Sequence, residues 1–258
     1  MNPLCDYYFV GAALPPLTLG EAPELSFVDL KILLNENLRE GDLQKVAAML
    51  RPIDVANIAA LWLGLPLDER GNFSAKELEE ALLVREQLPV FVGDFLERYD
   101  SLRERLRYFA SLYASLYRES HSGFVGQSYA LEREVRLVLC ALRSKYLSRD
   151  VARELQFEDP TDPFVADILA QKDAQDYIPP SEYEMLKASF ERYKDDPKQL
   201  FQAELQFRFN KYEELSENQH FTPDRILNYL ARLIIAESWD GLKSEEGRKI
   251  MEDLSKYE

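Results

Sequence analysis

The middle of the chain has the most regular pattern of apolar and polar positions. Apolar and aromatic residues recur there at alternating spacings of four and three, at Leu88, Val92, Phe95, Tyr99, Leu102, Leu106, Phe109, Tyr113 and Leu116. This spacing places them on one face of a helix, while the charged residues between them face water. We therefore expect residues 88–116 to bury this seam. They form either one long helix or two helices that break near Asp100, with Ser101 capping the second.

A second helical stripe follows a short turn. Residues 121–126 contain glycine, and apolar side chains then recur at Leu131, Val135, Val138, Leu142 and Tyr146. Two long amphipathic helices joined by a short turn pack antiparallel as neighbours. The pattern predicts a long central helical hairpin over residues 88–147.

Helix-start signals recur along the rest of the chain. The capping-box pattern, serine followed three residues later by glutamate, occurs at Ser74/Glu77, Ser101/Glu104 and Ser181/Glu184, and Thr222-Pro223 is a further start signal. We expect additional helices over residues 27–38 (capped by Ser26), from 41 onward, over 53–63 (opened by Pro52), and near 181–194, 198–215, 222–238 and 244–254. Residues 7–14 suit a short N-terminal strand or a helix, ended by Pro15-Pro16. The predicted fold is an all-α multi-helix bundle of about ten helices.

Only one segment departs from this helical pattern over a long stretch. Residues 157–180 are rich in aspartate and proline and show no apolar period. Such composition is typical of a linker or hinge. We therefore expect an N-terminal helical part with the central hairpin over residues 1–156 and a C-terminal helical part over 181–258. The alternative is one continuous domain.

Composition and charge exclude several classes of protein. Hydrophobic residues make up 46% of the 258 residues, which excludes a disordered chain. The 31 Lys and Arg residues face 46 Asp and Glu residues, and a net charge of -15 repels nucleic-acid phosphates and anionic lipid surfaces. The charge keeps the protein soluble and can steer a basic partner protein toward it.

Three features of the sequence predict the cellular compartment. The longest apolar stretch, residues 55–67, is too short to span a bilayer, and the first eight residues lack the basic start of a signal peptide. Cys5 and Cys140 fit a reducing compartment with free thiols, a disulfide between them being the less favoured alternative. We expect a cytoplasmic protein, peripheral to the membrane at most and without direct membrane insertion.

No residue pattern predicts a catalytic, cofactor-binding or metal site. The segment Asp68–Glu77 resembles a calcium EF-hand loop, but Pro66 and Arg70 occupy positions where calcium needs oxygen ligands. The two histidines, His121 and His220, have no partner at metal-binding spacing, and no glycine-rich phosphate loop is present.

Other candidate groups favour a structural role. His121-Ser122 lacks the sequence context of a nucleophile and fits a helix terminus better. The acidic pairs Glu79/Glu80 and Glu213/Glu214 fit solvated helix faces. The aromatic stripe of Phe201, Leu205, Phe209 and Tyr212 fits a core better than a ligand site.

Segments along the whole chain resemble known families. Residues 7–15 (YYFVGAALP) and the run Asp68-x-Arg70-Gly71-Asn72-Phe73-Ser74 resemble an uncharacterised bacterial family whose members accompany V-type ATP synthase subunits. Residues 53–58 (IDVANI) resemble the Asp-x-x-Asn helix start of the V-type ATPase C (d) subunit. Residues 139–145 (LCALRSK), 226–233 and 234–254 resemble later helices of that subunit.

The resemblance implies a function. It implies a non-catalytic subunit of a V-type ATPase or ATP synthase, a helical bowl that links the central stalk to the membrane rotor ring. The implied partners are the central-stalk subunits and the ring, with no catalytic residue and no cofactor. This chain is shorter than that subunit, and its Asp-x-x-Asn pattern is not clearly repeated, which leaves the family's threefold pseudo-repeat open. The alternatives are a freestanding helical adaptor and a carboxylate-dependent hydrolase with two converging acidic side chains.

Overall fold

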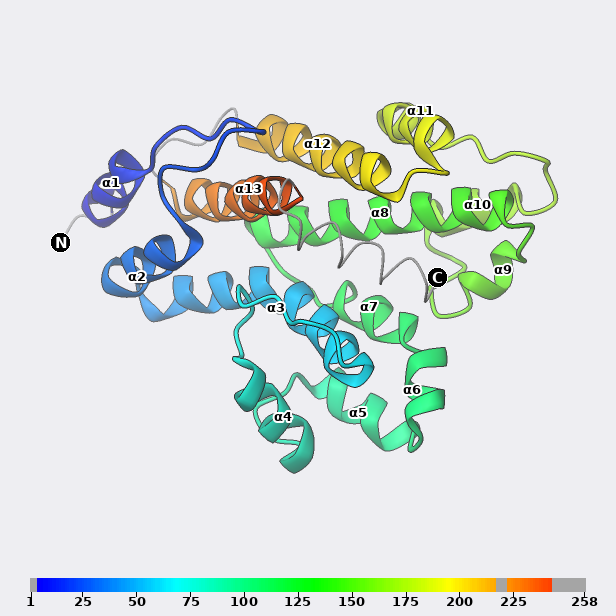
Figure 1. Cartoon of the computed structure of the whole chain (residues 1–258), viewed down its shortest axis with the longest axis horizontal. Helices are drawn as coiled ribbons and strands as arrows, with labels where there is room; N and C mark the ends of the chain where they lie inside the picture. Colours follow the sequence, from blue (N-terminus) through cyan, green and yellow to red (C-terminus); the bar gives the residue numbers. More distant parts are fainter. Residues whose placement is uncertain (1–3, 217–221, 243–258) are drawn as a thin grey trace. The chain divides into compact units, whose positions relative to one another are not determined.

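The computed structural model describes residues 4–216 and 222–242 (Figure 1). Within these residues it contains thirteen α-helices, one short 3-10 helix and no strand, so the predicted all-α bundle is confirmed. The predicted helix over 244–254 and His220 lie outside the described residues. The chain forms two compact units. Unit 1 comprises residues 1–38 and 127–258, and unit 2 comprises residues 39–126.

Unit 1 contains the ends of the chain and most of the longest helices. Its helices are α1 (Leu4–Ala13), α2 (Phe27–Asn37), most of α8 (Gly123–Tyr146), α9 (Val151–Glu154), α10 (Pro163–Ala170), η1 (Ser181–Tyr183), α11 (Glu184–Tyr193), α12 (Pro197–Ser216) and α13 (Pro223–Gly241). Helices α12 and α13 run side by side (Figure 1), α11 packs on α12, and α1, α2 and α13 contact one another. Apolar side chains from these helices form the core, including Leu30, Leu34, Val138, Leu186, Leu205 and Leu233.

Unit 2 is built on one long helix. It contains α3 (Glu40–Leu63), α4 (Ala75–Val84), α5 (Val90–Arg98), α6 (Leu102–Arg107) and α7 (Ala110–Leu116), followed by the first turn of α8. Helix α3 packs against α4 and α7, and α5 packs against α7. Its core includes Leu50, Val55, Ile58, Leu78, Val92, Leu96 and Leu112.

Helix α3 corrects the expectation of two separate helices. Pro52 lies inside it rather than opening a new helix. Proline cannot donate the hydrogen bond of its own turn, but α3 buries residues on both sides of Pro52, including Leu50 and Val55, and this packing favours a continuous helix. Among the described helices α3 alone is long and apolar enough to cross a bilayer, with a mean hydropathy of 1.4 over its best window. Within the folded protein, 44% of that window is buried.

The first part of the predicted hairpin, residues 88–116, is not one long helix. The break expected near Asp100 is present, and a second break separates α6 from α7 at Tyr108 and Phe109. Each break resets the helical phase, so the four-three spacing does not produce one continuous buried seam. Leu102 is 48% exposed, and its predicted burial is therefore wrong. The second arm is confirmed as helix α8. The packing of the two arms involves both units and stays a prediction.

Most of the predicted helix ends are confirmed. Ser26 caps α2, Ser74 and Ser101 form capping boxes with Glu77 and Glu104, and Thr222 caps α13 before Pro223. The prediction of a capping box at Ser181 is wrong, because residues 181–183 form a 3-10 helix and α11 begins at Glu184.

Two further segments are now defined. Residues 4–13 are helical, which decides the open choice between strand and helix at the N-terminus. The segment 157–180, expected as a linker, contains α10 and contributes Val165, Ile168 and Tyr177 to the core of unit 1. The division of the chain at residues 156 and 180 stays a prediction.

Candidate functional site

Two polar residues are buried on α3 in unit 2. Asp54 is 7% exposed and Asn57 is 2% exposed, and their spacing places both side chains on the same helix face. A buried carboxylate or amide is stable only when its hydrogen-bonding groups are satisfied. Both find their partners in the loop that precedes α4.

The loop over residues 68–72 supplies these partners. The Asn57 side chain donates to the backbone carbonyl of Asp68 and accepts from its N–H, each at 2.8 Å. Asp54 accepts hydrogen bonds from the backbone N–H and the side-chain Nδ2 of Asn72, at 2.7 and 2.6 Å. We call this group of four residues (Asp54, Asn57, Asp68 and Asn72) the polar clamp.

Gly71 lies against the polar clamp, where there is no space for a larger residue. A Cβ atom at this position would be 2.6 Å from Oδ1 of Asp54 and 3.2 Å from Nδ2 of Asn57. Burial alone would raise the pKa of Asp68, but the hydrogen bonds and charge of Arg70 outweigh it and lower the pKa. The clamp therefore fixes the loop and positions the start of α4 at Ser74.

The clamp also shows how the EF-hand-like segment is used. Asp68 pairs with Arg70, and Glu77 accepts from the backbone N–H and hydroxyl of Ser74 in the capping box. These oxygens are directed at protein donors rather than at a common point. Among the described residues no group of three or more His, Cys, Asp and Glu side chains is arranged to hold a metal ion.

Unit 2 also contains a groove, which lies between α5 and α7. Its volume is about 560 Å³, and its lining residues are Phe91, Asp94, Phe95, Glu97, Arg98, Tyr99, Ser111, Leu112 and Ser115. Phe95 and Leu112 are buried and form its apolar part, while Ser111 and Ser115 bring small side chains from α7. We call this feature the α5–α7 groove.

Aromatic side chains support the groove from within unit 2. Phe95 stacks on Trp62 with ring centroids 6.3 Å apart and contacts Tyr99 at 4.9 Å, and Tyr99 stacks on Tyr108 at 4.7 Å. Nε of Arg105 donates to the carbonyl of Tyr99 at 2.8 Å, and its guanidinium lies 5.7 Å from the Trp62 ring centroid. Aromatic contacts of this kind add stability beyond simple burial. The groove is therefore held in a defined shape.

Charged side chains stand at the edge of the groove. Asp94, Glu97 and Arg98 are exposed, and their side chains have no hydrogen-bond or ion-pair partner among the described residues. An apolar floor with free charges at its edge can hold an apolar anchor and pair with a partner's charges. The same arrangement occurs where amphipathic helices dock into grooves.

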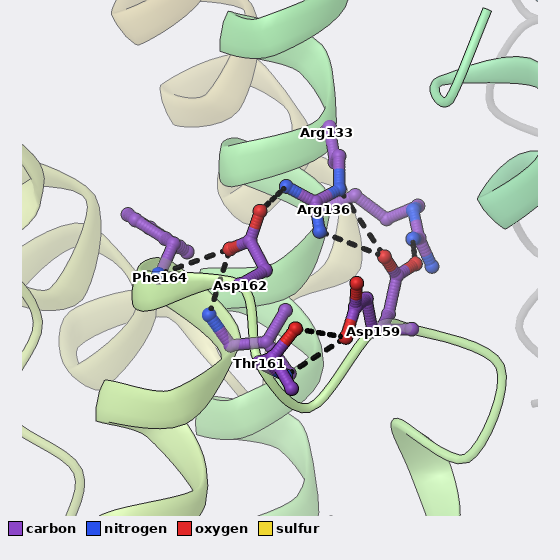
Figure 2. A network of polar contacts seen from close by, with 8 residues as sticks. Arg133, Arg136, Asp159, Thr161, Asp162 and Phe164 are labelled. Atoms are coloured by element: carbon purple, nitrogen blue, oxygen red, sulfur yellow. Dashed lines mark hydrogen bonds and ion pairs between the residues drawn. The ribbon is translucent and has the colours of Figure 1, made fainter.

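Unit 1 contains a network of buried ion pairs. Figure 2 shows Arg133 and Arg136 of α8 facing the loop before α10, where both bind the buried carboxylate of Glu158 and Arg133 also binds Asp162 at 3.1 Å. Asp162 in turn caps α10 by accepting from the N–H groups of Phe164 and Val165. A buried carboxylate with two guanidinium partners has its charge compensated, so this network fixes α10 on α8.

The Leu-Arg-x-Lys segment that carries part of the resemblance has a similar role. Arg143 of α8 lies 3.6 Å from the carboxylate of Glu204 on α12. Nζ of Lys145 donates to three backbone carbonyls in the turn that follows α10, those of Gln171, Lys172 and Ala174, at 2.8, 2.6 and 2.5 Å. These bonds anchor the turn after α10 to α8, and a cation is favoured near the C-terminal end of a helix by the helix dipole.

The remaining singled-out residues have structural surroundings. Leu205, Phe209 and Tyr212 of the aromatic stripe are buried, as expected for a core. His121 lies 3.4 Å from Glu119, which pairs with Arg51 at 2.6 Å. The Cys140 thiol is free, and burial raises its pKa, so the reactive thiolate form is disfavoured.

The sequence analysis predicted neither the polar clamp nor the α5–α7 groove of unit 2. The resemblance named residues 53–58 and 68–74 as separate motifs, and no periodicity indicated that they bond to each other. Part of the groove could be predicted from the sequence, because Phe95 and Tyr99 belong to the predicted seam. Asp94 and Glu97 carry no signal beyond their positions on the polar face of the same helix.

Comparison with known proteins identifies the family. Relatives from Chlamydia muridarum and Chlamydia pneumoniae are 28% and 29% identical to this chain. The alignments cover 97% and 98% of this chain and 98% of each relative, and both relatives bear the name of uncharacterized proteins. No solved structure matches the chain significantly. Residues 4–257 match the model of the family DUF2764, described as a protein of unknown function, and the chain therefore belongs to the DUF2764 family.

Proposed function

We propose that this chain is a non-catalytic subunit of a V-type ATPase or ATP synthase, which links the central stalk to the membrane rotor ring. It would be cytoplasmic and attached to the membrane only through the complex. The resemblance of residues 53–58, 139–145 and 226–254 to the V-type C (d) subunit supports the choice of partners. The all-helical fold of the described residues is compatible with that role.

The α5–α7 groove is the observation that carries the proposal. Its apolar floor at Phe95 and Leu112 can receive an apolar anchor from a partner helix. Asp94 and Glu97 offer two carboxylates, one helical turn apart, to basic residues on the same partner. We therefore expect the groove to dock an amphipathic helix of the stalk that carries both features.

Charge should influence the rate of this association more than its strength. The net charge of -15 attracts a basic partner surface over a distance that depends on ionic strength. Apolar anchoring in the groove does not share this dependence. Association should therefore slow in high salt without being abolished.

The test is reconstitution of the full chain with purified central-stalk subunits and detergent-solubilised rotor ring, followed by sizing and a salt titration. The Asp94→Asn/Glu97→Gln double variant removes two charges at the groove. The matched control is Glu79→Gln/Glu80→Gln, which removes two charges from the exposed face of α4. We expect the groove variant to weaken association and the α4 variant to leave it nearly unchanged.

Two other results would change the assignment. If the wild-type chain binds neither the stalk nor the ring at micromolar concentration, the rotary-motor proposal is wrong and a freestanding helical adaptor becomes the better account. If the chain binds but both double variants behave alike, the complex is supported and the groove is not its docking site.

A carboxylate-dependent hydrolase is the alternative from another class. It needs two acidic side chains at one pocket, and Asp94 and Glu97 do line the same groove. Both side chains are exposed to solvent, and nothing in their surroundings separates an acid role from a base role. Turnover of a glycoside panel that disappears in Asp94→Asn/Glu97→Gln would favour this alternative.

A further inference from the structure

Helix α6 carries positive charge beside the C-terminal end of α5, where Arg98 and Tyr99 line the α5–α7 groove. Residues 98–107 contain four arginines and two acidic residues, in a chain whose net charge is -15. One of the two acidic side chains, Glu104, is already engaged in the capping box with Ser101. The local charge at this end of the groove is therefore opposite in sign to the charge of the whole chain.

Contacts with Tyr99 hold α6 against the groove. The ring of Tyr99 stacks on that of Tyr108, the residue that follows α6. Within α6, Nε of Arg105 donates to the backbone carbonyl of Tyr99, and its guanidinium lies over the ring of Trp62. Arg105 thus faces the interior of unit 2, and the position of α6 relative to the groove is fixed within that unit.

Two other arginines of α6 face solvent. Arg103 and Arg107 are four residues apart, so their side chains lie on one face of the helix. Both are exposed, and neither has a hydrogen-bond or ion-pair partner among the described residues; the guanidinium of Arg107 lies 5.4 Å from the ring centroid of Tyr108. Like charges at this spacing weaken a helix, and carboxylates from a partner would relieve their repulsion. We call these two residues the α6 arginine pair.

The charge of the exposed surface changes sign along the chain from α5 to α6. The carboxylates of Asp94 and Glu97 come first, and Arg98 and the α6 arginine pair follow. Leu102, which is 48% exposed, adds an apolar side chain at the start of α6. A uniformly charged partner, such as a nucleic acid or an anionic membrane, is repelled by the acidic part of this surface. A helix that carries both signs of charge is attracted by both parts.

We propose that the α5–α7 groove and the α6 arginine pair bind one amphipathic helix whose polar face is basic in one half and acidic in the other. This inference rests on the proposed docking of a stalk helix in the groove, and it names the charge order of that helix. The basic half pairs with Asp94 and Glu97, and the acidic half pairs with the α6 arginine pair. A helix that is basic throughout meets repulsion at α6, so the charge order provides specificity.

Two synthetic peptides test this charge order. Each has about 18 residues, which is about five helical turns, and both have leucines at the same positions. The bipolar peptide has lysines in one half of its polar face and glutamates in the other, whereas the basic peptide has lysines throughout. Fluorescence anisotropy gives the Kd of each peptide for the full chain at about 0.15 M salt, where charges beyond about 8 Å are largely screened. The ratio of the two Kd values in the wild type is the reference.

Reversal of the α6 arginine pair should change this ratio. Arg103→Glu/Arg107→Glu should shift it toward the basic peptide by about tenfold or more, because the acidic half of the bipolar peptide then meets carboxylates. The matched control is Arg153→Glu/Lys172→Glu, which changes the net charge equally at exposed positions of unit 1 and should shift the ratio much less. Equal shifts in the two double variants, or no saturable binding of either peptide at millimolar concentration, would overturn the inference.

A neutral variant keeps the test independent of folding. Arg103→Gln/Arg107→Gln should melt near the wild-type temperature, because both side chains are exposed, and should shift the ratio in the same direction by a smaller factor. A variant that folds normally and leaves the ratio unchanged would also contradict the role of the α6 arginine pair.

Reconstitution with purified central-stalk subunits separates this inference from the proposed function. If the wild-type chain binds the stalk and Arg103→Glu/Arg107→Glu binds it equally tightly, the charge order assigned to the stalk helix is wrong and the proposed function stands. If the wild-type chain binds no stalk subunit but the peptide ratio shifts as expected, the proposed function is wrong and the preference of this surface for a bipolar helix is supported.

Discussion

Substitution of Gly71 by alanine should destabilise unit 2 specifically through the polar clamp. The added Cβ would be 2.6 Å from Oδ1 of Asp54, whereas real Cβ atoms keep at least 3.0 Å from such neighbours. Interiors are close-packed, so a displacement of at least about 0.4 Å must be taken up by Asp54 or by the loop. Either movement lengthens the two hydrogen bonds that Asp54 accepts from Asn72.

The expected loss follows from those bonds. A hydrogen bond to a charged group contributes about 1.5–3 kcal/mol, and one of the two should be lost or badly distorted. Alanine also restricts the unfolded chain, which offsets about 0.4–1 kcal/mol. We therefore expect Gly71→Ala to reduce the free energy of unfolding by about 0.5–2.6 kcal/mol. The matched control is Gly93→Ala inside α5, where a Cβ meets nothing within 4 Å and the helix should gain about 0.5–1 kcal/mol.

The chain offers a selective reporter for this measurement. Of its two tryptophans, Trp62 lies in unit 2 and Trp239 in unit 1. In a Trp239→Phe background, urea titration followed by fluorescence reports the unfolding of unit 2 through Trp62. In the additional presence of Asp54→Ala the clashing oxygen is absent, so Gly71→Ala should lose most of its effect. Equal stability of Gly71→Ala and Gly93→Ala would refute the role assigned to the clamp.

Three further substitutions test other parts of the structure. Arg70 lowers the pKa of Asp68, so their interaction stabilises the fold above the unfolded pKa of an aspartate and is lost as pH falls through the lower folded pKa. Arg70→Met should therefore be less stable than the wild type in urea titrations at neutral pH, and a difference that persists undiminished in strong acid would contradict this. Lys145→Met should lower the free energy of unfolding by about 1–3 kcal/mol, because three carbonyls in the turn after α10 lose Nζ as a donor. Hydrogen exchange should rise in residues 171–176, and unchanged exchange there would argue against this role of Lys145. Tyr177→Phe should leave stability unchanged or raise it by up to about 1 kcal/mol in thermal denaturation, because the buried hydroxyl has no partner among the described residues, whereas a clear loss would reveal one.

Local sequence signals predicted the class of the fold and most helix starts. Capping depends on a few neighbouring residues, so Ser74 with Glu77 and Thr222 before Pro223 could be read directly from the chain. The apolar spacing predicted helix α8 for the same reason. Where a local signal competes with packing, prediction fails. Pro52 signals a helix start, but the buried residues around it favour a single helix through it.

The candidate sites depend on contacts between segments that are distant in the sequence. The four-three spacing could not show that Leu102 is exposed, because that depends on how breaks near Asp100 and Tyr108 redirect the chain. Likewise, residues 14–17 line a cavity together with residues of α13, more than two hundred positions later.

The sequence by itself determined that this chain is helical, acidic and rich in capped helix starts, because each of these properties depends on composition or on neighbours within one or two turns. Only the tertiary structure decided what the buried polar residues do. Asp54 and Asn57 are two polar residues on a largely apolar helix, and their partners in the loop over residues 68–72 become adjacent only when the chain folds. Buried polar groups must be satisfied wherever the fold brings a partner, and sequence spacing does not encode that place.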